Sequence, residues 1–245
     1  MNSEIDTMIT PTHDLIVKSS LIKISPEKAA IKGEALLSVE LEEALNQMIN
    51  NQIPDLWLKK SFVSLKPLGS YIKDLKDRLA FMQEWLDTKI PDIFWINKFF
   101  FVHGFLTSAK QNYARDKKIP IDTMTLDFEV IRDPDTVEVP NHGVLILGMN
   151  MEGFKWDHRD FVCSESDPKI LFSAAPMIWF KPVSAVDKVT RGVFPCPVYL
   201  TMERRGVLAT TGHSTNFVLK CSLPTDRPVA HWIKRGAAMI CALSD

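Results

Sequence analysis

The residues best suited to chemistry lie in the stretch RRGVLATTGHSTNFVL at 204–219, where His213 and Ser214 are adjacent. The letters GHSTN come within one residue of the G-x-S-x-G pattern, in which a sharp turn between a strand and a helix exposes a nucleophilic serine. One hypothesis is therefore a serine hydrolase that uses Ser214 with His213 or His231. The next residues, FVLKCSL, alternate as a strand does, so they favour a polar hairpin turn over the required helix.

A second candidate pair is Asp127 and Glu129, two positions apart on a predicted strand and so on one face. Paired carboxylates about 6.5–9.5 Å apart can hydrolyse glycosides. Here they share the polar side of an amphipathic strand, which favours a solvated face. The histidines show no metal-ligand spacing, and the absence of any Gly-Lys dipeptide excludes a P-loop. We expect no catalytic site, metal or cofactor.

Composition narrows the class of protein. The chain has 245 residues, a formal net charge of −1 and 46% hydrophobic residues, enough for a real core. This charge gives no reason to expect a nucleic-acid partner. The most apolar stretch, 93–106, is too short to span a bilayer, and we expect a cytosolic protein without a membrane partner. The four cysteines form no C-x-x-C pair and are expected to be buried thiols: Cys163, Cys196, Cys221 and Cys241.

The first half of the chain has helical periodicity. Ser25 and Pro26 indicate a helix start, and Ser38 can cap a second helix. A third helix is predicted over about 70–87, with Ile72, Leu75, Leu79, Met82 and Leu86 inward and Lys73, Asp74, Lys76 and Asp77 in water. A fourth is predicted over about 105–117. Residues 1–24 have no clear period and are expected to be an extended or disordered lead-in.

From Pro120 the period changes to that of strands. Residues 123–130 alternate cleanly, and 143–152 and 175–182 predict further strands. The short gaps within 197–223 predict a three-stranded meander whose second turn is the GHST segment. The tail at 231–243 is expected to be a last strand with a bulge at Gly236.

This order of elements predicts an α+β fold. We expect a lead-in at 1–24, a helical subdomain at 25–119 and an antiparallel β subdomain at 120–245. Six or seven short antiparallel strands suggest a barrel or a strongly curled sheet, because either arrangement hides sheet edges.

Long stretches of the sequence resemble the C-terminal domain of axonemal dynein heavy chains. The resemblance covers roughly 32–243, and its most specific segments are LKPLGS, FLTSAKQNYAR, IPIDT and ERRGVLATTGHSTNFV. It implies a helical part followed by an incomplete, six-stranded antiparallel β-barrel.

The resemblance also implies a function. Such a domain is a non-catalytic regulatory module that docks on the AAA+ ring of its own heavy chain and tunes motor output in ciliary movement. Its expected partners are those AAA+ modules and the subunits of the dynein complex. ATP and microtubules are bound only by other parts of the parent motor, a microtubule-stimulated ATPase. The implied location is the cytoplasm and cytoskeleton, in the axoneme of a cilium or flagellum.

A module that docks on a ring needs exposed apolar surface, for which the first helices and 91–106 are candidates. The residues expected to make contact are Trp57, Phe62, Trp95, Phe99, Phe100, Arg204, Arg205 and His213. For each of them, packing within the domain or a solvated turn is the alternative interpretation.

Overall fold

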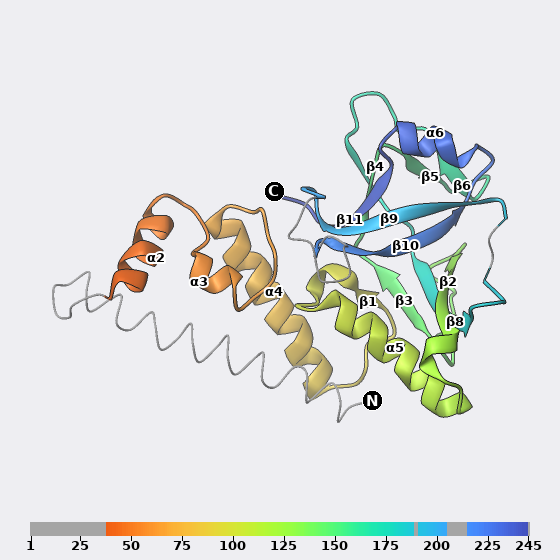
Figure 1. Ribbon diagram of the computed structural model, residues 1–245, viewed down its shortest axis with the longest axis horizontal. Helices are drawn as coiled ribbons and strands as arrows, with labels where there is room; N and C mark the ends of the chain where they lie inside the picture. Colours follow the sequence, from red (N-terminus) through yellow and green to blue (C-terminus); the bar gives the residue numbers. More distant parts are fainter. Residues whose placement is uncertain (1–37, 189–190, 205–214, 245) are drawn as a thin grey trace. The chain divides into compact units, whose positions relative to one another are not determined.

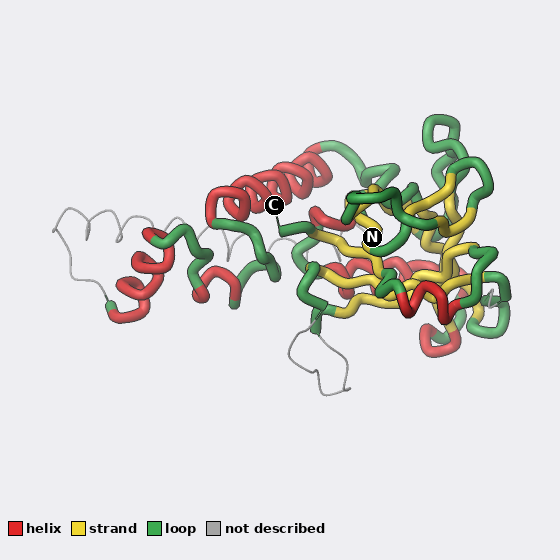
Figure 2. Tube along the Cα trace, turned by 90° about the horizontal axis from the view of Figure 1, so that it is seen from above, coloured by secondary structure: helices red, strands yellow, loops and turns green. Residues whose placement is uncertain are grey.

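The computed structural model describes residues 38–188, 191–204 and 215–244, which fall into two compact units divided between Ile90 and Pro91 (Figure 1). Unit 1 is helix and loop, whereas most of unit 2 is strand and loop (Figure 2). This agrees with the predicted α+β class. The expected lead-in at 1–24 and the helix predicted from Ser25 lie outside the described residues.

Unit 1 contains the second and third predicted helices. Its elements are α2 (Val39–Ile49), α3 (Asp55–Leu58) and α4 (Leu68–Asp87). Ser38 is the N-cap of α2, as predicted, and its hydroxyl accepts a hydrogen bond from the backbone N–H of Leu41 at 3.4 Å. Pro54 and Pro67 precede α3 and α4, because proline has no N–H to leave unpaired at a helix start.

The buried face of α4 differs from the predicted one. Leu86 is 45% exposed, and Asp74, which was expected in water, is only 8% exposed. Asp74 tolerates burial because the guanidinium of Arg78, one turn later, donates to its carboxylate at 3.2 Å. The buried face consists of Tyr71, Asp74, Arg78, Met82 and Trp85.

Unit 2 begins with β1 (Phe94–Trp95), the 3-10 turn η1 (Ile96–Lys98) and α5 (Val102–Lys117). Helix α5 starts three residues earlier than predicted and packs against strands β2 and β8, which are described next. The expected boundary at 119/120 marks the change from helices to strands. The division into compact units comes about 30 residues earlier, because α5 packs with the sheets.

One mixed sheet of unit 2 has four strands in the order β1-β3-β8-β2, with β1 parallel to β3. The turn η2 (Ile121–Thr123) leads into it, and its other strands are β2 (Met124–Val130), β3 (Val144–Leu147) and β8 (Ile178–Ser184). Strand β2 matches the predicted strand at 123–130, but Asp127 is buried at 4% exposure rather than solvated. Both α5 and a strand of the second sheet, β10, pack against β2, so its polar side is not uniformly wet.

A second sheet has five strands in the order β10-β9-β11-β4-β7, and β5 pairs with β6 in a separate hairpin. Its core includes Phe154, Phe194 and Trp232, whose ring centroids lie 6.0–6.2 Å apart. The strands of these two sheets, with helix α6, are β4 (Asn150–Glu152), β5 (Lys155–Asp157), β6 (Val162–Ser164), β7 (Phe172–Ala174), β9 (Val193–Thr201), β10 (Phe217–Pro224), α6 (Val229–Lys234) and β11 (Ala238–Ala242).

The predicted antiparallel barrel is not found. No closed barrel forms in the described parts of the chain, and both β1 with β3 and β11 with β9 are parallel pairs. The sequence pattern suggested only local hairpins. Instead α6 separates β10 from β11, which allows β11 to reach the far side of β9 and to run parallel with it.

Three local predictions are also corrected. The strand order of the meander predicted at 197–223 is wrong, because β9 and β10, its first and third strands, pair directly with each other in antiparallel register. Its predicted middle strand and GHST turn lie largely outside the described residues. Residues 143–152 form two strands in different sheets, divided at Gly148, which has a φ of +89°. The tail is helix α6 followed by β11. Gly236, with a φ of +66°, ends the helix rather than forming a bulge.

Candidate docking surface

The segment from Phe94 to Val102 alternates between buried and exposed aromatic residues. Phe94 and Ile96 are 4% and 0% exposed, whereas Trp95 between them is 47% exposed. This follows from the pairing of the short edge strand β1 with β3, in which Phe94 lies opposite Ile146 and Trp95 opposite Leu147. Neighbouring residues of a strand face opposite sides, so one of each pair enters the core.

The inward residues anchor this segment to α5. The Phe99 ring stacks on the Phe105 ring at a centroid distance of 3.9 Å, and Phe94 lies 5.0 Å from Phe105. Phe99 is 7% exposed. It was expected to make contact with another part of the motor, and the structure places it inside unit 2.

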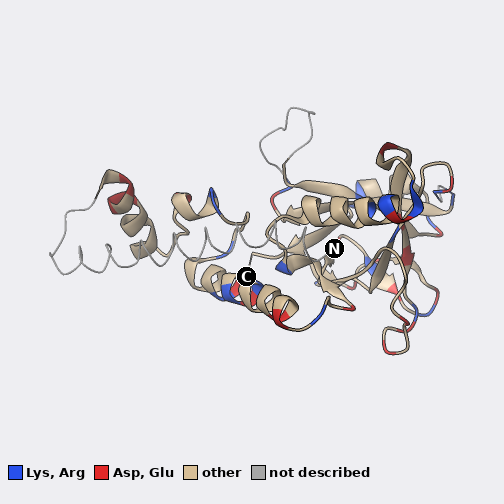
Figure 3. Cartoon of the chain, turned by 90° about the horizontal axis from the view of Figure 1, so that it is seen from below, with Lys and Arg blue, Asp and Glu red and all other residues tan. Residues whose placement is uncertain are grey.

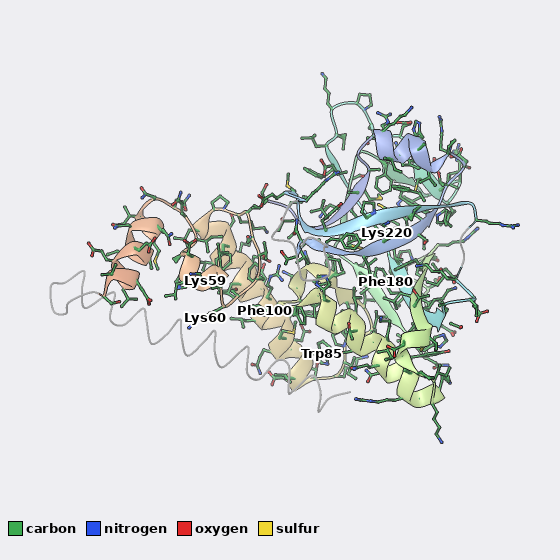
Figure 4. All side chains as sticks on the ribbon, viewed as in Figure 1. Lys59, Lys60, Trp85, Phe100, Phe180 and Lys220 are labelled. Carbon is green, nitrogen blue, oxygen red and sulfur yellow. The ribbon has the colours of Figure 1, made fainter. Side chains whose placement is uncertain are left out.

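The outward residues form what we call the aromatic strip, consisting of Trp95, Phe100 and Phe101. Phe101 is 61% exposed and Phe100 is half-buried at the amino-terminal end of α5 (Figure 4). Gly148 makes room for Trp95, because a Cβ atom there would lie only 3.1 Å from Cε3 of the indole. Phe101 was not among the contact residues expected from the sequence. The alternation of buried and exposed positions in this segment was the signal that could have identified it.

The base of the loop between β9 and β10 is held by Asn216. Its Oδ1 accepts hydrogen bonds from the backbone N–H and the hydroxyl of Thr201 at 3.0 and 3.2 Å, and its Nδ2 donates to the Thr201 carbonyl at 3.2 Å. Asn216 is 4% exposed, so these hydrogen bonds replace those that water would otherwise make to the polar groups of Asn216 and Thr201. His103 of α5 joins the same base to the strip: its Nε2 lies 2.9 Å from the carbonyl of Phe217, and its ring centroid 6.1 Å from that of Phe101.

Arg204 enters the same loop with a left-handed φ of 55°. Its guanidinium contacts the carboxylate of Glu152 at 2.5 Å and donates to the carbonyl of Gly236 at 2.8 Å. Arg204 was expected to make contact outside the domain, yet its charged group is paired within unit 2. Arg205 and His213, two other expected contact residues, lie outside the described residues.

The serine-hydrolase hypothesis fails on the element that comes after Ser214. Ser214 itself lies outside the described residues, but Phe217–Pro224 is strand β10 and not the helix that a nucleophile elbow requires. Asn216, where the motif would have glycine, uses its side chain to close the loop base. His231, the other proposed base, has its Nε2 2.6 Å from Oε1 of Glu165, which also pairs with Arg235.

The two expected contact residues of unit 1 belong to an internal stack. Phe62 is 5% exposed and its ring stacks on that of Tyr71 at 4.9 Å, with the Arg78 guanidinium 3.8 Å from the centroid of the Phe62 ring. Trp57, half-buried, lies 6.4 Å from Tyr71. Burial raises the pKa of Tyr71 most strongly, and the nearby Asp74 carboxylate raises it further.

The thiols of unit 2 are unsuited to nucleophilic chemistry. All four cysteines are buried thiols. Burial raises the pKa of Cys163 to about 12 and raises those of Cys196 and Cys221 well above the usual value. In the residues that the structure describes, no group of three His, Cys, Asp or Glu side chains is arranged to hold a metal ion. Of the described helices, none is long and apolar enough to cross a membrane.

Comparison with known proteins gives one consistent family. Residues 15–241 match the family model for the C-terminal domain of dynein heavy chains. The sequence is 47% identical over 231 residues to dynein axonemal heavy chain 3 of Mus musculus, covering 94% of this chain and 6% of that protein. It is 44% identical over 216 residues to dynein axonemal heavy chain 12 of Homo sapiens, covering 88% and 7%. It is 45% identical over 216 residues to dynein axonemal heavy chain 1 of Rattus norvegicus, covering 87% and 5%.

Proposed function

Because the chain belongs to the family formed by the C-terminal domains of dynein heavy chains, we propose that it is a non-catalytic docking module of an axonemal dynein motor. It spans only about 6% of the length of the relative it matches at 47% identity. The rest of such a heavy chain supplies the partner surface, which we propose to be its AAA+ ring. In this proposal the module tunes motor output during ciliary movement, in the axoneme of a cilium or flagellum.

The observation that carries this proposal is the aromatic strip. Within seven positions Trp95 is 47% and Phe101 is 61% exposed and Phe100 is half-buried, whereas the other apolar residues of the segment are buried. Exposed aromatic side chains held on rigid elements are typical anchors of protein interfaces. The Phe94–Phe99–Phe105 cluster beneath the strip supplies that rigidity.

The expected contact residues then divide by role. Trp95 and Phe100 dock directly, and Phe101 joins them. Phe99 and Arg204 support the surface from within unit 2. Arg205 and His213, which lie outside the described residues, are proposed to add polar contacts.

Unit 1 contributes a second, weaker docking region. Along α4 the predicted apolar row is only partly covered, with Leu86 45% exposed and Ile72, Leu75 and Leu79 half-buried. We assign Trp57 to this region because its ring is half-buried, whereas Phe62 stabilises the unit internally. Nucleotide hydrolysis and microtubule binding belong, in this proposal, to other parts of the parent motor.

The test is a full-length motor with Trp95→Ser and Phe101→Ser together. Truncating two anchors removes about 2–4 kcal/mol of docking free energy, so microtubule gliding velocity and its coupling to ATPase rate should change. The matched control is Leu171→Ser, which alters an apolar residue that is 73% exposed elsewhere in unit 2. If the double variant moves microtubules and hydrolyses ATP as the wild type does, the docking role of the strip is wrong.

A further inference from the structure

The opposite end of α5 carries a second surface of different chemistry. Tyr113 of α5, His142 before β3 and Trp179 of β8 form a row in which successive ring centroids lie 5.3 and 5.4 Å apart. Tyr113 and Trp179 are half-buried and His142 is exposed. The row therefore presents aromatic edges to solvent at a place far along α5 from the aromatic strip.

The backbone fixes this row in position. Trp179 donates from its indole N–H to the carbonyl of His142 at 3.0 Å. Gly143 has a φ of +73°, and a Cβ atom there would lie 2.8 Å from that indole nitrogen and 2.4 Å from the carbonyl oxygen of Phe180. Only glycine fits, so the turn before β3 is shaped around the Trp179 ring.

Lysine side chains lie over the faces of two of these rings. The Lys181 ammonium is 5.3 Å from the Trp179 ring centroid, and it also contacts Glu129 at 2.9 Å. The Lys117 ammonium is 5.9 Å from the Tyr113 ring centroid, and its side chain is 51% exposed. Each of these ammonium groups also pairs with a carboxylate at 2.9 Å, Lys117 with Asp116 and Lys181 with Glu129. Surface ion pairs contribute little free energy, so the carboxylates of a partner can replace them.

The end of α5 adds further positive charge. Residues 110–118 contain four cations and one carboxylate, and the basic residues gather toward the helix end (Figure 3). Lys118 ends the helix in the left-handed conformation with a φ of 55° and is exposed. We call the surface made of Tyr113, Lys117, Lys118, His142, Trp179 and Lys181 the basic aromatic face.

We propose that the basic aromatic face binds an acidic, Asp- or Glu-rich segment of a partner protein. Carboxylates would pair with the ammonium groups at the end of α5 and on β8, while the aliphatic parts of the segment pack on the aromatic edges. Fixed aromatic rings with adjacent cations offer both anchoring area and charge complementarity. This site is separate from the docking surface, so it could recruit another protein to a docked module.

The mixed charges favour a peptide over a nucleic acid. Asp116 and Glu129 lie among the cations, with side chains 69% and 54% exposed. A continuous phosphate backbone would meet these carboxylates, and its affinity comes from many cations along its length. A peptide can place its carboxylates at the lysines alone.

The experiment measures the fluorescence anisotropy of a labelled poly-glutamate peptide titrated with the 245-residue chain at about 0.15 M salt. Reversing two charges with Lys117→Glu and Lys118→Glu should weaken binding about tenfold. Tyr113→Ala should weaken it with no change of charge, and Tyr113→Phe should not. The charge control is Lys220→Glu with Lys234→Glu, which changes the net charge equally on β10 and α6, and Lys220 lies well away from the end of α5 (Figure 4).

Three results would each overturn the proposal. The first is a wild-type protein that does not bind the peptide. The second is a control pair that weakens binding as much as the α5 pair, since this would indicate attraction by net charge alone. The third is a single-stranded oligonucleotide of equal length that binds as tightly as the peptide, which would identify a general polyanion surface.

Discussion

Two groups of aromatic residues in this protein have similar composition but differ in solvent exposure. In unit 1, Phe62 and Tyr71 stack on each other and the Arg78 guanidinium lies over the Phe62 ring, so the group packs internally. In unit 2, the segment from Phe94 to Val102 buries some of its apolar residues and leaves Trp95 and Phe101 outside. Aromatic content alone therefore does not show which rings are exposed, whereas in this segment the alternation of buried and exposed positions does.

The difference between the two groups is tested most strongly by truncating one phenylalanine in each and comparing the loss of unfolding free energy. Phe62→Ala should cost about 3–5 kcal/mol of unfolding free energy, because it opens a cavity beneath a buried ion pair. Phe101→Ala should change the same quantity by no more than about 0.5 kcal/mol, because its ring is mainly in water. Urea unfolding of the 245-residue chain measures both. Equal costs would mean that the outward assignment of Phe101 is wrong.

Substitution of Asn216 tests whether its hydrogen bonds stabilise the base of the loop between β9 and β10. Asn216→Ala leaves the N–H and carbonyl of Thr201 without their partner in a buried position, which should cost about 1–3 kcal/mol. The same substitution at the exposed Asn141 is the control and should have little effect. If the two variants unfold at the same urea concentration, the hydrogen bonds between Asn216 and Thr201 do not stabilise the base of the loop.

Alkaline pH tests how deeply the thiols of unit 2 are buried. A thiol with a raised folded pKa contributes its full stability below its unfolded pKa of about 8.5–9, and that contribution is lost as pH rises toward the folded value. For Cys163, with a folded pKa of about 12, the unfolding free energy should fall by about 1.4 kcal/mol per pH unit above pH ~9. Cys196 and Cys221 should add to this slope.

Urea midpoints measured between about pH 7 and 10 would show this fall before most tyrosines and lysines of the unfolded chain ionise. A Cys163→Ala variant, which lacks one such thiol, should show a shallower slope. A midpoint that is constant across the range would contradict the assigned burial of the thiols.

Periodicity was sufficient for much of the fold. The stepping of apolar residues predicted α2 and α4, and strict alternation predicted β2. The helix predicted at about 105–117 corresponds to α5. The buried face of α4 was not predicted in this way, because apolar periodicity takes no account of charged residues, and Asp74 and Arg78 are buried together as an i, i+4 ion pair. The parallel pairing of β11 with β9 was also not predicted, because it depends on contacts between residues distant in the sequence and not on a local turn.

The candidate site was predictable in location more than in detail. The first helices and the segment 91–106 were expected to be docking surface, which stays a prediction, and Trp95 lies exposed within that segment. Phe99 and Arg204 proved to be tied inside unit 2, because a ring stack and an ion pair with Glu152 satisfy them. Residue type alone does not distinguish a satisfied side chain from an available one; burial and partners decide it.

The most direct test of the docking account compares solvent access to the aromatic strip in two forms of the protein. Hydroxyl-radical footprinting would measure the oxidation rates of Trp95 and Phe101 in the 245-residue chain and in the whole motor, with Leu171 as an exposed reference. The account predicts that both aromatic residues react much more slowly in the whole motor while Leu171 is unchanged. Equal oxidation rates of Trp95 and Phe101 in the two forms would contradict it.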